Sequence, residues 1–199
     1  MIEDVVSEFD KKRIQELLPK IDFTFSPITT SEKFPANFHI LVSRPDNDSL
    51  IKETLIISPY YYFFLGIVEK FCKRNNLKYK KVIRACLNHT YHIPGYDQGD
   101  PHYDFSYDHM VVIVYLTSSN VSSTLVFDKV QKFNNKNDVY PAPQTFPIKK
   151  EFLPELGKII AFNGRYYHSN IIPPIGENRI VCVFNLLIDK PWYRYLGFS

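Results

Sequence analysis

The chain of 199 residues is 45% apolar and 23% charged, as ordinary globular domains are, which excludes a disordered or collagen-like chain. Its length predicts a single domain over residues 1–199 that buries about 70% of the surface exposed by the unfolded chain, so neither a disulfide nor a metal is needed to hold the core. The net charge of +3 is small for a dedicated nucleic-acid-binding protein.

The cysteines and the apolar segments indicate the cellular compartment of the protein. Cys72, Cys86 and Cys182 are odd in number and lack CxxC spacing, which argues against a disulfide framework and a zinc finger. The N-terminal segment is acidic and amphipathic, unlike a signal peptide. The most apolar stretch, 60–68, is too short to cross a bilayer. We therefore expect a soluble, cytoplasmic protein with no membrane partner.

Residues 1–79 are expected to form N-terminal helices with supporting strands. Apolar residues at roughly helical spacing predict an amphipathic helix, or two short ones, over 2–18. The apolar run 38–42 predicts a strand. Ser58 and Pro59 have the form of an N-cap followed by proline at the first helical position, which predicts a helix through about Lys73.

From residue 80 the pattern changes to short strands separated by turn signals. The polar stretch 128–150 is expected to be an insertion within the core 80–188, typical of a lid, a binding loop or a partly disordered segment. A series of short strands after helices predicts a β-sandwich or small barrel with the helices packed outside. The expected strands are 81–91, 101–105, 110–117, 122–127, 158–163, 166–172 and 178–188.

The block around His102 and Asp104 carries the first chemical signal. In an extended segment, side chains two residues apart point to the same face, so this imidazole and this carboxylate converge. They are two parts of a 2-His-1-carboxylate triad, which binds non-haem Fe(II) and leaves positions open for other ligands. His168, near the start of a predicted strand, is the best candidate for the third ligand.

Arg179 provides the second signal, because it opens an apolar strand that would enter the barrel. A buried, unpaired charge is costly, so such an arginine needs an anion. Its planar guanidinium suits a carboxylate. A dicarboxylate that chelates a metal at one end and meets Arg179 at the other would satisfy both demands.

In this order, the motifs resemble the Fe(II)/2-oxoglutarate-dependent dioxygenase superfamily, and within it the prolyl-4-hydroxylase-like branch. The resemblance covers about residues 80–188 and implies a mainly β fold with flanking helices, a double-stranded β-helix or jelly roll related to the cupins. The matching residues are Tyr91, His102-Tyr103-Asp104, Phe162 to His168, Pro173-Pro174 and Gly176-Glu177-Asn178-Arg179.

The resemblance also implies roles for these residues. His102, Asp104 and His168 would bind Fe(II), and Arg179 would pair with the distal carboxylate of the cosubstrate 2-oxoglutarate. Tyr115 would assist that contact, and Tyr91 would lie on the other side of the cosubstrate. The reaction would use O2, release succinate and CO2, and hydroxylate a C–H bond. The branch favours a peptidyl residue as substrate, while a free amino acid, another small molecule or a nucleobase stay open.

Other interpretations of the same residues stay open at the level of sequence. His102 and Asp104 could form a surface hydrogen bond, and Arg179 a surface salt bridge. Tyr115 could be a packed core tyrosine. A zinc site of His89, His92 and His102 is a further alternative. For the whole chain, the alternatives are a cupin-like barrel that binds a metal or ligand without oxygenase activity, and an inactive scaffold on the same fold.

Overall fold

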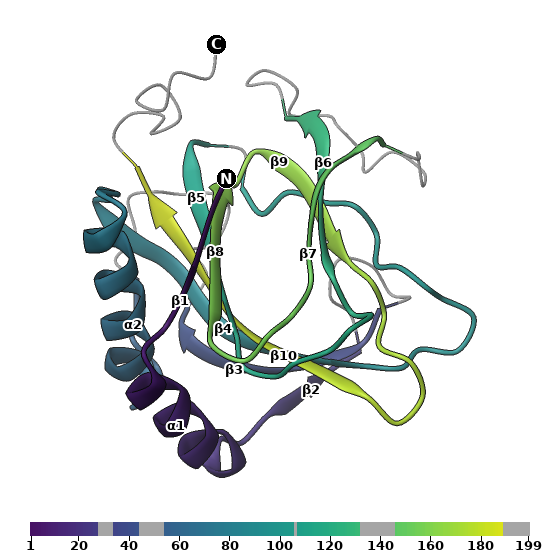
Figure 1. Cartoon of the computed structure of the whole chain (residues 1–199), viewed down its shortest axis with the longest axis horizontal. Coiled ribbons are helices and arrows are strands. Elements are labelled where there is room, and N and C mark those ends of the chain that lie inside the picture. The colour runs from purple at the N-terminus through teal and green to yellow at the C-terminus, as the bar shows by residue number, and fades with distance from the viewer. Residues whose placement is uncertain (28–33, 44–53, 106, 132–145, 189–199) are drawn as a thin grey trace.

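Two facing β-sheets form the body of the molecule in the computed structural model, which describes residues 1–27, 34–43, 54–105, 107–131 and 146–188. The larger sheet has seven strands and the smaller has three. Figure 1 shows the smaller sheet opposite the larger one. This arrangement confirms the expected jelly roll.

The structure contains two α-helices, one short 3-10 helix and ten strands in the described residues. The first elements are β1 (Ile2–Val5), α1 (Glu8–Leu17), a short 3-10 helix (Leu18–Lys20), β2 (Thr24–Ser26), β3 (Ala36–Val42) and α2 (Tyr61–Arg74). The later strands are β4 (Lys81–Tyr91), β5 (His109–Tyr115), β6 (Thr124–Val130), β7 (Ile148–Phe152), β8 (Lys158–Asn163), β9 (Tyr166–Asn170) and β10 (Asn178–Leu187). The strand order is β1-β8-β5-β10-β4-β3-β2 in the larger sheet and β7-β6-β9 in the smaller one. No helix in these ranges is long and apolar enough to span a membrane.

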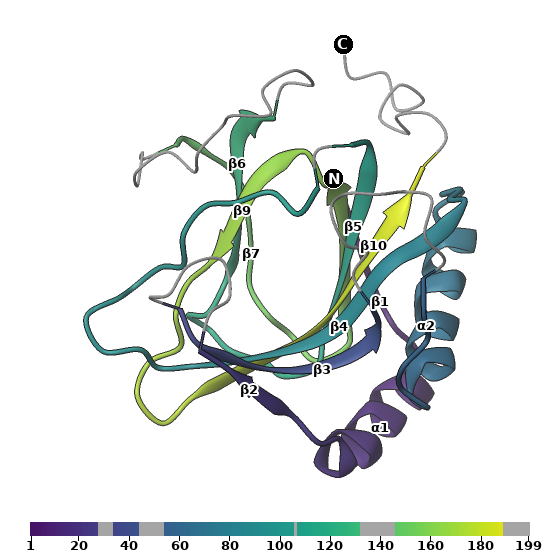
Figure 2. The same ribbon diagram turned by 180° about the vertical axis from the view of Figure 1, so that it is seen from behind.

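The central strands of the larger sheet are buried on both faces, and in β5 alternate side chains join two different parts of the core. Val111 and Ile113 point between the two sheets, where they join one apolar cluster. Val112 and Val114 point outward and join the cluster that packs under the helices. Figures 1 and 2 show α1 and α2 beside the larger sheet, on the side away from the smaller one. Near-continuous apolar strands are the pattern expected of a sheet covered on both faces.

The helix α2 covers the sheet with one apolar stripe. Its buried residues recur at the three- and four-residue spacing that places side chains on one helix face. Phe64, Val68 and Phe71 are almost fully buried there. The helix predicted through about Lys73 is confirmed, but its N-cap is Tyr60 and not Ser58, and Pro59 precedes the first helical residue.

The structure also corrects the bounds of other expected elements. The helix predicted over 2–18 begins only at Glu8, after the N-cap Ser7, because the preceding residues form β1 and pair with β8. The strand predicted over 101–105 is reduced to a single bridge between His102 and His168. The insertion predicted over 128–150 contains the end of β6 and the start of β7, and its residues 132–145 lie outside the described ranges.

Candidate active site

His102 and His168 face each other across one pair of backbone hydrogen bonds. The His102 amide donates to the His168 carbonyl at 3.0 Å, and the His168 amide donates to the His102 carbonyl at 2.8 Å. Residues directly opposite in an antiparallel pair carry their side chains on the same face. The two ring centroids lie 4.6 Å apart, so the structure brings together two histidines that are distant in sequence.

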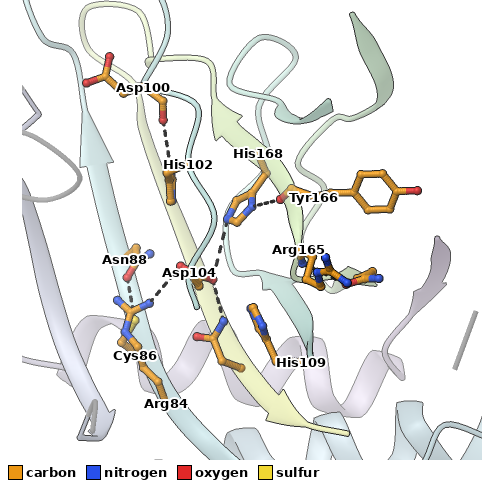
Figure 3. A network of polar contacts seen from close by, with 12 residues as sticks. Arg84, Cys86, Asn88, Asp100, His102, Asp104, His109, Arg165, Tyr166 and His168 are labelled. Carbon is orange, nitrogen blue, oxygen red and sulfur yellow. Dashed lines mark hydrogen bonds and ion pairs between the residues drawn. The ribbon is translucent and has the colours of Figure 1, made fainter. Parts of the chain in front are cut away.

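Asp104 completes the cluster. Its Oδ2 lies 3.9 Å from Nε2 of His168, and Figure 3 shows the two side chains pointing toward one another. One ligand atom from each of His102, Asp104 and His168 lies within 4.8 Å of the others. Two imidazole nitrogens and one carboxylate oxygen are the donor set of non-haem Fe(II) sites.

Backbone carbonyls orient both imidazoles. Nδ1 of His102 lies 2.9 Å from the Asp100 carbonyl, and Nδ1 of His168 lies 3.1 Å from the Tyr166 carbonyl. A carbonyl can only accept, so each Nδ1 carries the hydrogen and donates it. Each Nε2 is left with its lone pair, which is the arrangement that a metal-binding histidine requires.

The protonation states of the cluster also suit metal binding. Burial, with the nearby His168, lowers the pKa of His102 to about 4, and burial lowers the pKa of His168. Burial alone would raise the pKa of Asp104, but His168 and Arg84 outweigh it and hold that pKa well below its usual range. At neutral pH the cluster therefore presents two neutral imidazoles and one carboxylate, the forms that ligate a metal.

Two residues outside the expected site support Asp104. Asn185 on β10 donates from Nδ2 to Oδ2 of Asp104 at 2.7 Å. Arg84 on β4 places Nη1 4.0 Å from Oδ1 of the same carboxylate. A signal for Arg84 was present in the sequence, since it is a cation inside the apolar run Val82-Ile83-Arg84-Ala85-Cys86. It is the same signal that pointed to Arg179.

Arg179 is 5% exposed and lines the same cavity as the three clustered residues. It donates from Nη2 to the hydroxyl oxygen of Thr124 at 2.7 Å, while its Nε is buried without a hydrogen-bond partner. No salt bridge joins it to a carboxylate in the described part of the chain, and burial lowers its pKa. A buried guanidinium with this environment is suited to receive an anion from the cavity.

Tyr115 lies behind Arg179 and does not line the cavity. It is fully buried, and the Arg179 guanidinium lies 5.6 Å from the centre of its ring. Its hydroxyl donates to the Thr124 hydroxyl oxygen at 2.7 Å. Thr124 thus accepts two hydrogen bonds, and its own hydroxyl hydrogen can be donated to a ligand. Nothing in the sequence marks Thr124 beyond its place in a strand.

Tyr91 is not brought to the cavity. The cavity-lining residues of β4 are Arg84, Cys86, Asn88 and Thr90, all an even number of residues apart. Side chains alternate along a strand, so Tyr91 points to the other face, where its ring contacts His89. Thr90 takes the place at the cavity wall that was expected for Tyr91.

The zinc site considered for His89, His92 and His102 does not form. His89 packs against the ring of Phe23, and Nδ1 of His92 lies 3.3 Å from the Pro173 carbonyl. In the described residues, His102, Asp104 and His168 are the group that could hold a metal ion.

One cavity of about 910 Å³ contains the cluster and Arg179. Between these groups its wall is apolar, with Val111 and Ile113 from β5 and Val181 and Val183 from β10. The size is that of a ligand-binding site that encloses a small molecule. The cavity therefore presents a potential metal site and a buried cation, separated by apolar side chains.

Comparison with models of protein families and with curated protein sequences gives no match. Solved structures do match. A 2OG-Fe(II) oxygenase family protein from Burkholderia pseudomallei is 13% identical, with a TM-score of 0.63 over 91% of this chain and 80% of that one. A prolyl-4-hydroxylase from Pseudomonas putida is 9% identical, with a TM-score of 0.53 over 94% and 91%.

HygX from Streptomyces hygroscopicus, solved with nickel, 2-oxoglutarate and hygromycin B, is 12% identical, with a TM-score of 0.53 over 94% of this chain and 82% of that one. At these identities the likeness is one of fold. The chain folds as the Fe(II)/2-oxoglutarate oxygenases do, and the expected double-stranded β-helix is confirmed.

Proposed function

We propose that this protein is an Fe(II)- and 2-oxoglutarate-dependent oxygenase that hydroxylates a C–H bond of a peptidyl residue or a small molecule, with release of succinate and CO2. The observation that carries the proposal is the pairing of the His102–Asp104–His168 cluster with the buried Arg179 in one cavity. Either group alone would be compatible with a different kind of site. Together, on this fold, they match a metal chelator that is also an anion at its far end.

His102, Asp104 and His168 would hold the iron through two Nε2 atoms and one carboxylate oxygen. A triad of this kind leaves coordination positions open for the cosubstrate and for O2. When bound, the iron and 2-oxoglutarate supply the activation of O2 that the hydroxylation needs. The contribution of the protein is to hold three ligands in fixed orientation, through the Asp100 and Tyr166 carbonyls and the Asn185 amide.

Arg179 and Thr124 would bind the distal carboxylate of 2-oxoglutarate. Arg179 offers its guanidinium, and the hydroxyl hydrogen of Thr124 is available because its oxygen already accepts from Arg179 and Tyr115. Charge-assisted hydrogen bonds to a buried carboxylate are stronger than neutral ones. Val181 and Val183 would line the space between that carboxylate and the metal ligands with apolar side chains.

The first test needs no substrate. Fe(II) and then 2-oxoglutarate are added to metal-free protein under anaerobic conditions, and the visible spectrum is followed. We expect a metal-to-ligand charge-transfer band, which forms only when the cosubstrate chelates the iron. The same addition to His168→Ala should give no band, since one ligand is missing.

A folded, metal-loaded wild-type protein without the band would overturn the proposal. It would instead favour a cupin-like barrel that binds a metal or ligand without oxygen chemistry. The buried Arg179 speaks against that alternative, because a simple metal-binding barrel has no use for a desolvated cation beyond the metal ligands.

A further inference from the structure

Arg84 is a second cation in the cavity, and the role proposed above does not use it. It lies on β4, in the row of cavity-lining side chains that continues with Cys86 and Asn88. Its side chain keeps about 20% of its surface exposed. A guanidinium carries five N–H donors and has no acceptor. Its N–H groups therefore need hydrogen-bond acceptors, and the described residues provide few of them.

The contact between Arg84 and Asp104 does not satisfy that demand. The 4.0 Å separation of Nη1 and Oδ1 is an ion pair and is too long for a hydrogen bond. The structure shows no hydrogen bond from Arg84 to any residue in the described ranges. Asp104 itself is engaged with Asn185 and, under the proposed function, with the metal. Figure 3 shows the Arg84 guanidinium beside this carboxylate, at the lower end of the cluster.

Arg84 and Arg179 belong to opposite ends of the cavity. On β10, Arg179 pairs with Thr90, and Asn185 pairs with Arg84. Six residues of extended strand separate Arg179 from Asn185, which is roughly 20 Å at about 3.3 Å per residue. A single short dicarboxylate whose distal end lies at Arg179 therefore leaves Arg84 for a different ligand.

The charges in the cavity also indicate a further ligand at Arg84. This step rests on the proposed function, because it counts the charges of bound iron and 2-oxoglutarate. In the loaded site, the metal dication and the two arginines face one negative charge from Asp104 and two from 2-oxoglutarate, so one positive charge is left over. Two further carboxylates border the cavity, but Asp22 is exposed and Asp100 points away from the cluster in Figure 3. An uncompensated buried charge is costly. The remaining ligand is thus expected to be an anion.

The wall next to Arg84 is apolar. Ile40 on β3 pairs with Cys86, two residues from Arg84, and both Ile40 and Ile57 line the cavity. Ile40 and Ile57 are about half exposed, so they offer apolar surface to a ligand. A second negative charge on the ligand would repel Asp104, which favours a singly charged group over a phosphate.

We propose that the primary substrate is a small molecule with a carboxylate that pairs with Arg84 and an apolar body that lies along β3. This assignment favours a free carboxylic acid over an internal peptidyl residue. A peptidyl residue within a chain has no carboxylate to present beside its own reacting carbon unless its side chain provides one.

The test compares carboxylates with their neutral amides. Phenylacetate and phenylacetamide, and 4-phenylbutyrate and 4-phenylbutyramide, are titrated calorimetrically under nitrogen into protein saturated with Fe(II) and 2-oxoglutarate. Saturation blocks Arg179, so each probe reports on the rest of the cavity. We expect each acid to bind about tenfold or more tightly than its amide, the range of a hydrogen-bonded charge. Arg84→Met, kept saturated with Fe(II) and 2-oxoglutarate, should lose that preference.

Arg13→Met is the matched control, because it removes one exposed arginine from α1, where it pairs with Glu16. It should bind all four probes as the wild type does. If Arg84→Met does not fold, the acid–amide comparison is made on the wild type and on Arg84→Lys. Both retain a cation at this position and should prefer the acids. Equal binding of acids and amides, or binding of neither, would overturn the assignment.

The two proposals fail in different ways. A wild-type protein that binds 2-oxoglutarate but binds acids and amides equally would overturn the substrate assignment alone. Absence of 2-oxoglutarate binding in the wild type would overturn the proposed function. In that case the same acid–amide titration of metal-free wild type and Arg84→Met still tests Arg84 by itself.

Discussion

Arg179 and Tyr115 show how one residue acts through another. Arg179 borders the cavity directly, whereas Tyr115 reaches it only through the hydroxyl of Thr124. The sequence places both residues on strands of the barrel and does not show which of them borders the cavity. Both were therefore predicted to contact the cosubstrate. Their different depth implies effects of different size on cosubstrate binding.

Arg179→Ala should weaken 2-oxoglutarate binding by about 2–3 kcal/mol, because it removes a charge-assisted pair. Tyr115→Phe is the comparison variant, because it removes only one neutral hydrogen bond to Thr124. It should weaken 2-oxoglutarate binding by about 0.5–1.5 kcal/mol. Titration of the charge-transfer band measures both. An Arg179→Ala variant with wild-type affinity would contradict this role, and a Tyr115→Phe effect as large as that of Arg179→Ala would mean direct contact.

The residues of the candidate site were predictable to the extent that their chemistry is local. The i, i+2 spacing of His102 and Asp104 places them on one face, and the buried position of Arg179 follows from its apolar strand. Asn185 could not be found, because its role depends on which residue lies opposite it in space. The expectation for Tyr91 came from its position in a motif, and a shift of one residue along a strand reverses the face.

At the scale of elements, the tight turn between β8 and β9 depends on a residue without a side chain. Gly164 follows the last residue of β8, and its amide donates to the His109 carbonyl at 2.9 Å. A Cβ added at this position would overlap the buried imidazole of His109. The ring of His109 is in turn packed edge-on against Phe105, so it has little room to move.

We expect Gly164→Ala to lower the free energy of unfolding by about 1–3 kcal/mol, the usual cost of overpacking. Gly66→Ala makes the same chemical change in the middle of α2, where an added Cβ meets no atom within 4 Å. It should raise stability by about 0.5–1 kcal/mol, since alanine favours the helix. Urea denaturation measures the free energy of unfolding of both variants. Changes of the same sign and size would show that the contact between an added Cβ and His109 does not matter.

The elements themselves were predictable where apolar periodicity is strong. The helix α2 and strands β4, β5, β8 and β10 have continuous or periodic apolar patterns, and the structure confirms them. The strand β7 was missed because four of its five residues are exposed and only Phe152 is buried. Its strand character comes from pairing with β6, a tertiary contact that local sequence does not record.

At the scale of the whole molecule, all three cysteines are free thiols inside the core. Burial, with nearby Glu69, raises the pKa of Cys72 to about 12, and burial raises the pKa of Cys182 well above its usual value. The thiolate is the reactive form, and a raised pKa keeps these thiols protonated at pH 8.

The native protein at pH 8 should therefore react with a thiol reagent such as DTNB far more slowly than the protein unfolded in guanidinium. Native-state reaction should also slow on any addition that stabilises the fold, since labelling requires opening. Absorbance at the released thionitrobenzoate band measures the rate. Rapid stoichiometric labelling of the native protein would show that at least one cysteine is accessible.

The pairing of β1 with β8 shapes the order in which the chain can assemble. Ile2 pairs with Ala161, so β1 leaves the ribosome long before the strand that it pairs with has been made. Contacts this distant in sequence require a long loop to close, and they form slowly. Until they form, the open edge of β8 can recruit a strand from another molecule. A strand made before the rest of the sheet is thus among the last to take its place in it.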